Sequence, residues 1–195
     1  TGLRHIDTAQ MYGNEHDVGK ALRASGLPRR ELFVVTKVDP SNLGRNRFAS
    51  SVAKSMDNLG APADVLLIHW PPPDDDFDAT LDRLIAEKEK GMARAIGVSN
   101  FTPSMMRRAQ QRAQGAIICN QVEFHPLLDQ SKLLAASRES GIALTAYSPL
   151  ARGKALHPKP IQDIAARLKR HRLRMRAATL LRETFADDAT VLDDN

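Results

Sequence analysis

The sequence predicts an α/β fold, and within that class an eight-stranded parallel (β/α)8 barrel of the TIM type. Six apolar segments alternate with six amphipathic segments along the 195 residues, which indicates repeated βα units. The apolar segments are almost uninterrupted, as is typical of parallel strands buried on both faces. An open doubly wound sheet usually carries a G-x-G-x-x-G loop after its first strand. The sequence has no such loop, which favours the barrel.

The six expected strands are short apolar runs bounded by charged residues, glycine or proline. In chain order they are LRHIDTA at 3–9, LFVVTKV at 32–38, DVLLIH at 64–69, ARAIGV at 93–98, AIICNQVEF at 116–124 and IALTAY at 142–147. The second run contains a lysine, Lys37, and the third ends at His69 before a Trp-Pro-Pro-Pro sequence. Both residues are unusual in segments expected to be buried.

The six expected helices have apolar residues at three- and four-residue spacing and start or stop signals at their ends. They are expected at residues 15–24, 47–59, 79–90, 103–114, 129–140 and 158–170. Asn14 is the expected cap of the first helix. Thr102 is the expected cap of the fourth helix, with Pro103 at the first helical position.

Composition restricts the class of protein. With 42% hydrophobic and 26% charged residues, the chain is expected to be one soluble domain. Much of the net charge of +5 lies in RLKRHRLRMR at 167–176, so we expect no nucleic-acid partner for the domain. The single cysteine, Cys119, excludes an intramolecular disulfide and is expected to be a buried inert thiol. No metal-binding cysteine cluster, membrane span or signal peptide is recognised, so we expect a cytoplasmic protein.

Polar residues stand where each expected strand ends. In chain order they are Asp7 with Tyr12 in the following loop, Lys37, His69, Ser99-Asn100, Asn120-Gln121 and Tyr147-Ser148. In a parallel barrel, the carboxyl ends of the strands lie at one face, and that face carries the chemistry. The pattern therefore predicts an active site built from several strands.

Lys37 is the most informative of these residues. An ammonium is costly to bury without a carboxylate partner, and Asp7 on the adjacent strand is the expected partner. The pair would stabilise the phenolate of Tyr12 and make it a general acid, while His69 orients a carbonyl substrate. Each residue alone also has a structural interpretation: a strand-end ion pair, a core histidine, a packing tyrosine and a turn aspartate. The prediction rests on all four occurring together.

The blocks that contain these residues resemble the aldo-keto reductase superfamily, and within it most of all the bacterial 2,5-diketo-D-gluconate reductases. In chain order the blocks are RHIDTAQMYGNE, VVTK, LLIHWP, IGVSNF, NQVEFHP and AYSPL. The resemblance covers residues 1–166 and implies a partial barrel without its first and last strands. Residues 167–195 are expected to be a divergent, disordered or out-of-frame tail that lacks the family's grip on the cofactor 2′-phosphate. A truncated chain with an incomplete cofactor site is therefore expected.

The resemblance also implies roles for individual residues. The family's catalytic tetrad falls on Asp7, Tyr12, Lys37 and His69. The expected contacts with the cofactor, NADPH, are Ser99, Asn100, Gln121, Tyr147, Ser148 and Leu150. The first three would hold the nicotinamide carboxamide, Tyr147 would stack on the ring, and the last two would follow the pyrophosphate. Trp70 is expected to line the substrate pocket or to pack at the barrel rim.

The expected activity is the NADPH-dependent reduction of a small aldehyde or ketone, such as a keto-sugar acid like 2,5-diketo-D-gluconate, by a monomer. Two alternatives stay open. One is a catalytically impaired relative that acts as a binding or regulatory subunit. The other is a barrel lyase or aldolase in which Lys37 forms a Schiff base.

Overall fold

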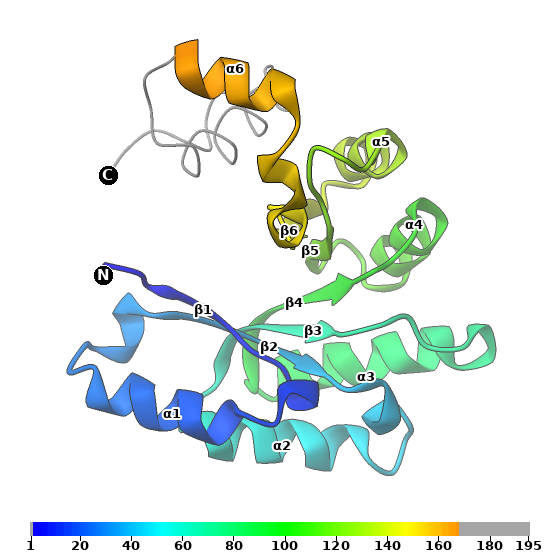
Figure 1. Cartoon of the computed structure of the whole chain (residues 1–195). Coiled ribbons are helices and arrows are strands. Elements are labelled where there is room, and N and C mark those ends of the chain that lie inside the picture. Colours follow the sequence, from blue (N-terminus) through cyan, green and yellow to red (C-terminus); the bar gives the residue numbers. More distant parts are fainter. Residues whose placement is uncertain (1, 168–195) are drawn as a thin grey trace. The chain divides into compact units, whose positions relative to one another are not determined.

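Figure 1 shows the computed structural model of the protein, which describes residues 2–167. Six strands form one sheet in the order β1-β2-β3-β4-β5-β6. They are β1 (His5–Asp7), β2 (Phe33–Val38), β3 (Ala63–Ile68), β4 (Ala93–Ser99), β5 (Ile117–Glu123) and β6 (Ala143–Tyr147). Successive strands from β1 to β5 pair in parallel. A doubly wound sheet reverses its strand order, whereas this sheet follows the chain, so the predicted class, a partial (β/α)8 barrel, is confirmed.

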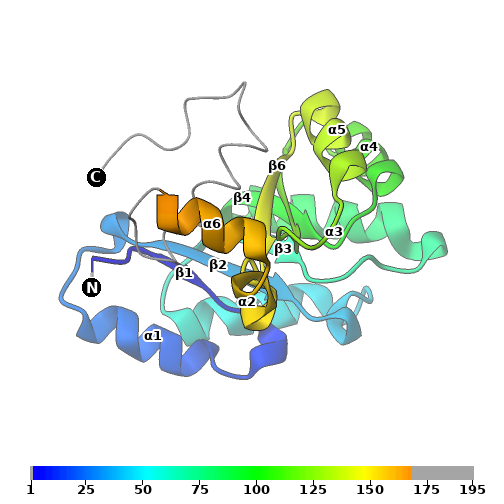
Figure 2. The same cartoon turned by 45° about the horizontal axis from the view of Figure 1, so that its top comes forward.

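A helix follows each strand, as predicted. The helices are α1 (Glu15–Ala24), α2 (Phe48–Leu59), α3 (Phe77–Glu89), α4 (Pro103–Arg112), α5 (Ser131–Ser140) and α6 (Lys159–Arg167). Figures 1 and 2 show α1, α2 and α3 along one face of the strands β1–β4. Within residues 2–167, no helix combines the length and apolar character needed to cross a bilayer.

The chain divides into two compact units. The first comprises residues up to Val122 together with Lys132–Thr145, and the second comprises Glu123–Ser131 and the residues from Ala146 onward. The carboxyl ends of β1 to β4 and residue Gln121 of β5 belong to the first unit. We describe the site within that unit.

The element ends differ from the predictions for local reasons. β1 is shorter than expected because the chain enters a 3-10 turn, η1 (Gln10–Tyr12), soon after Asp7. Asn14 occupies the N-cap position of α1, but its side chain makes no capping bond and instead accepts a hydrogen bond from the Thr8 hydroxyl at 2.7 Å. Thr102 caps α4 as predicted, by accepting from Met105 N. All of the expected tail at 167–195 except Arg167 lies outside the described residues. The last three residues of the helix expected at 158–170 also lie outside them.

An apolar layer lies beneath the polar ends of the strands. Val35, Val65 and Leu67 are buried in contact with each other, and Ala95 and Cys119 pack against them. Burial raises the pKa of the Cys119 thiol to about 11, so the thiol stays protonated near neutral pH, in agreement with the inert cysteine predicted from the sequence. Because side chains alternate along a strand, Val35 and Lys37 of β2 point to the same face. Lys37 therefore lies next to this apolar layer, toward the carboxyl end of β2.

The close packing of α1 against α2 requires a glycine. A Cβ atom on Gly19 would lie 2.0 Å from the carbonyl oxygen of Asn58 and 3.0 Å from Leu59 Cα. We therefore expect Gly19→Ala to lower the free energy of unfolding by about 2 kcal/mol, despite the better helix propensity of alanine. Urea denaturation measures the change. Lys20→Ala, at an exposed position of the same helix, is the matched control and should leave stability almost unchanged; equal stability of the two variants would contradict the expected clash.

Candidate active site

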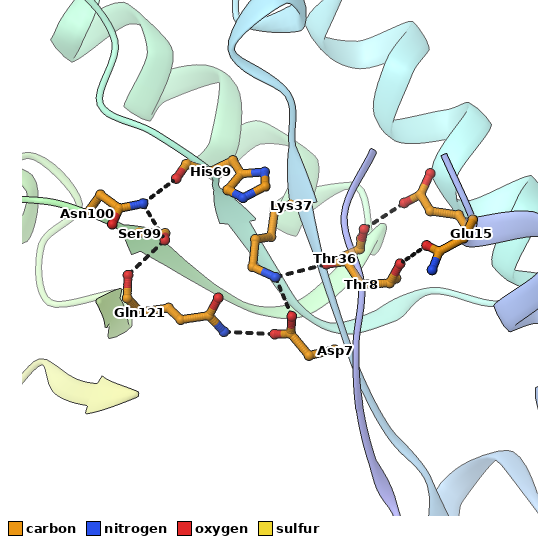
Figure 3. Close-up of polar contacts among 10 residues, drawn as sticks. Asp7, Thr8, Glu15, Thr36, Lys37, His69, Ser99, Asn100 and Gln121 are labelled. Atoms are coloured by element: carbon orange, nitrogen blue, oxygen red, sulfur yellow. Dashed lines mark hydrogen bonds and ion pairs between the residues drawn. The ribbon is translucent and has the colours of Figure 1, made fainter. Parts of the chain in front are cut away.

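An ion pair between a buried lysine and a partly exposed aspartate joins the first two strands. The side chain of Lys37 is 0% exposed. Its Nζ donates to Asp7 Oδ1 and, at 3.0 Å, to the carbonyl oxygen of Thr8. The second carboxylate oxygen of Asp7 accepts from Gln121 Nε2 at 2.7 Å (Figure 3). The predicted Lys37–Asp7 pair is thus present, and a residue of β5 completes the hydrogen bonding of its carboxylate.

Tyr12 lies over this ion pair, at the end of η1. Lys37 Nζ is 5.1 Å from the centroid of the tyrosine ring. The ring meets the imidazole of His69 edge-on, with 5.6 Å between centroids and an interplanar angle of 83°. Tyr12 is 51% exposed, and within the described residues its hydroxyl has no hydrogen-bond partner. The tyrosine side chain is therefore accessible to a ligand, and the face of its ring lies near the Lys37 ammonium.

His69 directly follows β3 and is buried. Its Nδ1 atom has no hydrogen-bond partner among residues 2–167, so the protein leaves part of the bonding capacity of the imidazole unused. Burial lowers the pKa of His69 below 6.5, and the nearby Lys37 ammonium lowers it further, against smaller opposing effects of Asp39 and Asp7. The imidazole is therefore neutral near pH 7.

The lowered pKa of His69 makes stability depend on pH. As pH falls through 6.5, the unfolded chain binds a proton at this residue while the folded chain does not, so the free energy of unfolding decreases. We expect wild type to lose more stability between about pH 7.5 and about pH 5.5 than His69→Gln, which cannot titrate. Urea denaturation at both pH values gives the comparison. Identical losses in the two proteins would show that His69 protonates as readily folded as unfolded.

Ser99, Asn100 and Gln121 form a hydrogen-bonded group near the carboxyl ends of β4 and β5. Asn100, which has a φ of 63°, donates through Nδ2 to the carbonyl oxygen of His69 at 3.0 Å and to Ser99 Oγ at 3.1 Å. The Ser99 hydroxyl donates to the carbonyl oxygen of Gln121 at 2.7 Å. Side-chain amides and a hydroxyl offer both donors and acceptors, which is the set that a nicotinamide carboxamide requires. The residues present therefore fit the nicotinamide end of the expected cofactor.

The other predicted residues divide between the two units. Trp70 follows His69 in the first unit and is 45% exposed, so it is not a buried packing residue. Tyr147, Ser148 and Leu150 belong to the second unit. There the carbonyl oxygen of Tyr147 accepts from Phe124 N at 3.3 Å, and Ser148 has a φ of 50°. The structure therefore brings together the tetrad, Ser99, Asn100 and Gln121.

Sequence reasoning missed two features of the site. The bond from Gln121 to Asp7 joins residues 114 positions apart, and no local pattern indicates it. The second is Glu15, which is buried at the start of α1 and accepts hydrogen bonds from the hydroxyls of Thr36 and Ser55. A threonine inside the apolar run of β2, on the face opposite Lys37, is the only signal that a polar partner lies behind the strand. Asn120, by contrast, is fully buried and bonds to the backbone of Phe101, which is a structural role.

Comparison with known proteins defines the family. The Aldo/keto reductase family model matches residues 1–190. The methylglyoxal reductase DkgB of Escherichia coli O157:H7 is 42% identical over 171 residues, which cover 85% of this chain and 64% of that protein. A crystal structure provisionally named as a 2,5-diketo-D-gluconic acid reductase B matches with a TM-score of 0.87 and 38% identity, over 90% of this chain and 63% of that one. The chain belongs to the aldo/keto reductase family.

An aldo-keto reductase from Bombyx mori in complex with NADP also matches, with a TM-score of 0.78 and 31% identity over 87% of this chain and 62% of that chain. The chain thus spans less than two thirds of the length of these relatives.

Proposed function

We propose that the protein reduces a small aldehyde or ketone to the alcohol with NADPH, and that Tyr12 donates the proton. The observation that carries the proposal is the buried Lys37, paired with Asp7 and lying against the face of the Tyr12 ring, with a neutral His69 at the edge of the same ring. Methylglyoxal and 2,5-diketo-D-gluconate, named in the relatives, define the substrate class: small polar carbonyl compounds.

The proposed roles follow from charge and position. A bound nicotinamide would supply the hydride that adds to the carbonyl carbon. Tyr12 gives its proton to the carbonyl oxygen, and the ammonium of Lys37 stabilises the phenolate that remains. Asp7 holds the ammonium of Lys37 in place by accepting one of its hydrogen bonds. The neutral imidazole of His69 orients the carbonyl oxygen, and Trp70 lines the substrate pocket.

The remaining predicted residues are proposed to hold the cofactor. Ser99, Asn100 and Gln121 bind the carboxamide, which fixes the face of the ring that meets the substrate. The roles expected of Tyr147, Ser148 and Leu150, which belong to the second unit, rest on the family resemblance alone. The preference for NADPH over NADH rests on the family alone.

The contacts of Lys37 argue against the lyase alternative. A Schiff-base lysine must expose a neutral amine to its substrate, whereas Lys37 Nζ is bonded to a carboxylate and to a backbone carbonyl and is fully buried. Borohydride in the presence of a carbonyl compound should therefore not attach that compound to Lys37.

The test uses the full chain, methylglyoxal and NADPH deuterated at the transferred hydrogen. We expect NADPH to be consumed only when the aldehyde is present, and the deuterium to appear on the carbinol carbon of the product. Binding is measured separately through the fluorescence of Trp70, the only tryptophan. NADPH binding without turnover would overturn the reductase and support the regulatory alternative.

A further inference from the structure

Within the described residues, the turn that carries Tyr12 has few side-chain hydrogen bonds of its own. Of the three residues in η1, Met11 and Tyr12 are about half exposed, and neither side chain makes a hydrogen bond within the described residues. The bond from the Thr8 hydroxyl to Asn14 ties together the two ends of the segment that contains the turn. The position of the phenol therefore depends on how the first residue of the turn, Gln10, is held.

Gln10 is bonded at both ends of its side-chain amide. Its Oε1 accepts from the backbone N–H of Asp39 at 2.9 Å and from Asn42 Nδ2 at 3.0 Å. Its Nε2 donates to Ser55 Oγ at 3.1 Å. Asp39 and Asn42 belong to the loop after β2, in which the 3-10 turn η3 runs from Pro40 to Asn42, and Ser55 belongs to α2. One amide thus fastens the tyrosine-bearing turn to two segments that follow the lysine-bearing strand.

The hydrogen-bond acceptors around Ser55 set the direction of these bonds. Glu15 Oε1 accepts from the Thr36 hydroxyl at 2.6 Å, and Oε2 accepts from the Ser55 hydroxyl at 3.0 Å. Ser55 Oγ also lies 3.2 Å from the carbonyl oxygen of Ser51, so its single proton goes to one of these two acceptors and its lone pairs are left for Gln10 Nε2. The amide oxygen of Gln10 must then face the Asp39 N–H. Thr36 is the neighbour of Lys37 on the opposite face of β2, as Figure 3 shows for both side chains.

We propose that Gln10 is a positioning residue that fixes Tyr12 over Lys37, with Ser55 and the backbone N–H of Asp39 setting the orientation of its amide. The inference rests on the proposed function, since it gives Tyr12 a reaction to perform. The network connects the turn of the proposed proton donor with the strand of its charged partner through the side chains of Gln10, Ser55, Glu15 and Thr36. A shift of the turn would separate phenol and ammonium without altering either one.

The test compares Gln10→Met with Gln110→Met. Methionine has a similar length and cannot replace the amide bonds. Gln110 is the matched control because it is equally half buried and also bridges two segments, donating to Ser140 O at 3.0 Å and accepting from Ile117 N at 3.3 Å, but on α4. Ser55→Ala is a second variant: it removes the acceptor of Gln10 Nε2, together with the donor to Glu15 Oε2, and leaves the bonds of Gln10 Oε1 in place. All are made in the full chain.

The first readout does not depend on activity. The chain has two tyrosines, so protein labelled with fluorotyrosine gives two fluorine NMR resonances, and Tyr12→Phe assigns them. We expect the Tyr12 resonance to shift or broaden in Gln10→Met, to a smaller degree in Ser55→Ala, and not at all in Gln110→Met. The second readout is kinetic: kcat should fall about tenfold in Gln10→Met, since small misplacements of a catalytic group cost one to two orders of magnitude, while the KM for NADPH stays the same.

The outcomes separate the two proposals. An unchanged Tyr12 resonance in Gln10→Met, or an equal shift in Gln110→Met, overturns the positioning role whatever the rates are. A second outcome is that the Tyr12 resonance shifts in Gln10→Met but not in Gln110→Met while the wild-type chain reduces no aldehyde. That result supports the positioning of Tyr12 and counts against the proposed reaction. A selective shift together with the selective loss of kcat supports both.

Discussion

Tyr12→Phe is expected to lower kcat for aldehyde reduction by a factor of about 10²–10⁴, the usual contribution of a positioned general acid, and to leave the fold intact. The variant removes only the hydroxyl, which has no hydrogen-bond partner within residues 2–167. The phenylalanine ring can keep the edge-on contact with His69 and the position above Lys37. The free energy of unfolding should therefore change by less than about 0.5 kcal/mol, and NADPH should bind as in wild type.

Steady-state rates, urea denaturation and Trp70 fluorescence measure these three quantities. With proton transfer impaired, the chemical step limits the rate, so deuterated NADPH should slow the variant more than it slows wild type. Met11→Leu alters the adjacent half-exposed residue of the same turn and is the control for disturbance of the turn itself. A Tyr12→Phe variant as fast as wild type would remove Tyr12 from the chemistry.

Polar residues within apolar strands made the fold and part of the site predictable from the sequence. Lys37 within VVTKV and His69 at the end of DVLLIH are costly to bury without a purpose, and their neighbours along the chain define the strand ends. This is why the Lys37–Asp7 pair was predictable. The strand order followed from the same alternation, since a regular βα repeat without a phosphate loop favours a barrel.

The supporting network was not predictable from the same patterns. Glu15 stands in the first turn of a helix, where acidic residues are common because of the helix dipole, so its burial leaves no mark in the sequence. Ser55 and Gln10 are 45 residues apart and look like ordinary surface residues. Asn14 occupies the predicted cap position, but bonds to Thr8 because that hydroxyl is fully buried and needs a partner. Long-range polar contacts of this kind depend on how the elements pack.

Lys37→Met is expected to reduce both stability and activity. The lysine side chain is fully buried, whereas the carboxyl side chain of Asp7 is 34% exposed. Removing one partner of a fully buried ion pair costs about 3–5 kcal/mol, and partial hydration of the remaining carboxylate reduces this to about 2–3 kcal/mol here. Activity should be lost because no cation remains to stabilise the tyrosine phenolate. Urea denaturation and aldehyde reduction measure the two effects.

A double-mutant cycle separates the two effects of that substitution. In the variant that combines Asp7→Asn with Lys37→Met, no charge is left unpaired, and the asparagine can still bond to Gln121, so stability should recover most of the loss. Activity should not recover, because the reaction requires the ammonium itself and not merely a filled cavity. Recovery of both would mean that the ion pair only maintains the shape of the site. Recovery of neither would mean that the lost stability comes from the missing bond between Lys37 and the carbonyl oxygen of Thr8, and not from the unpaired carboxylate of Asp7.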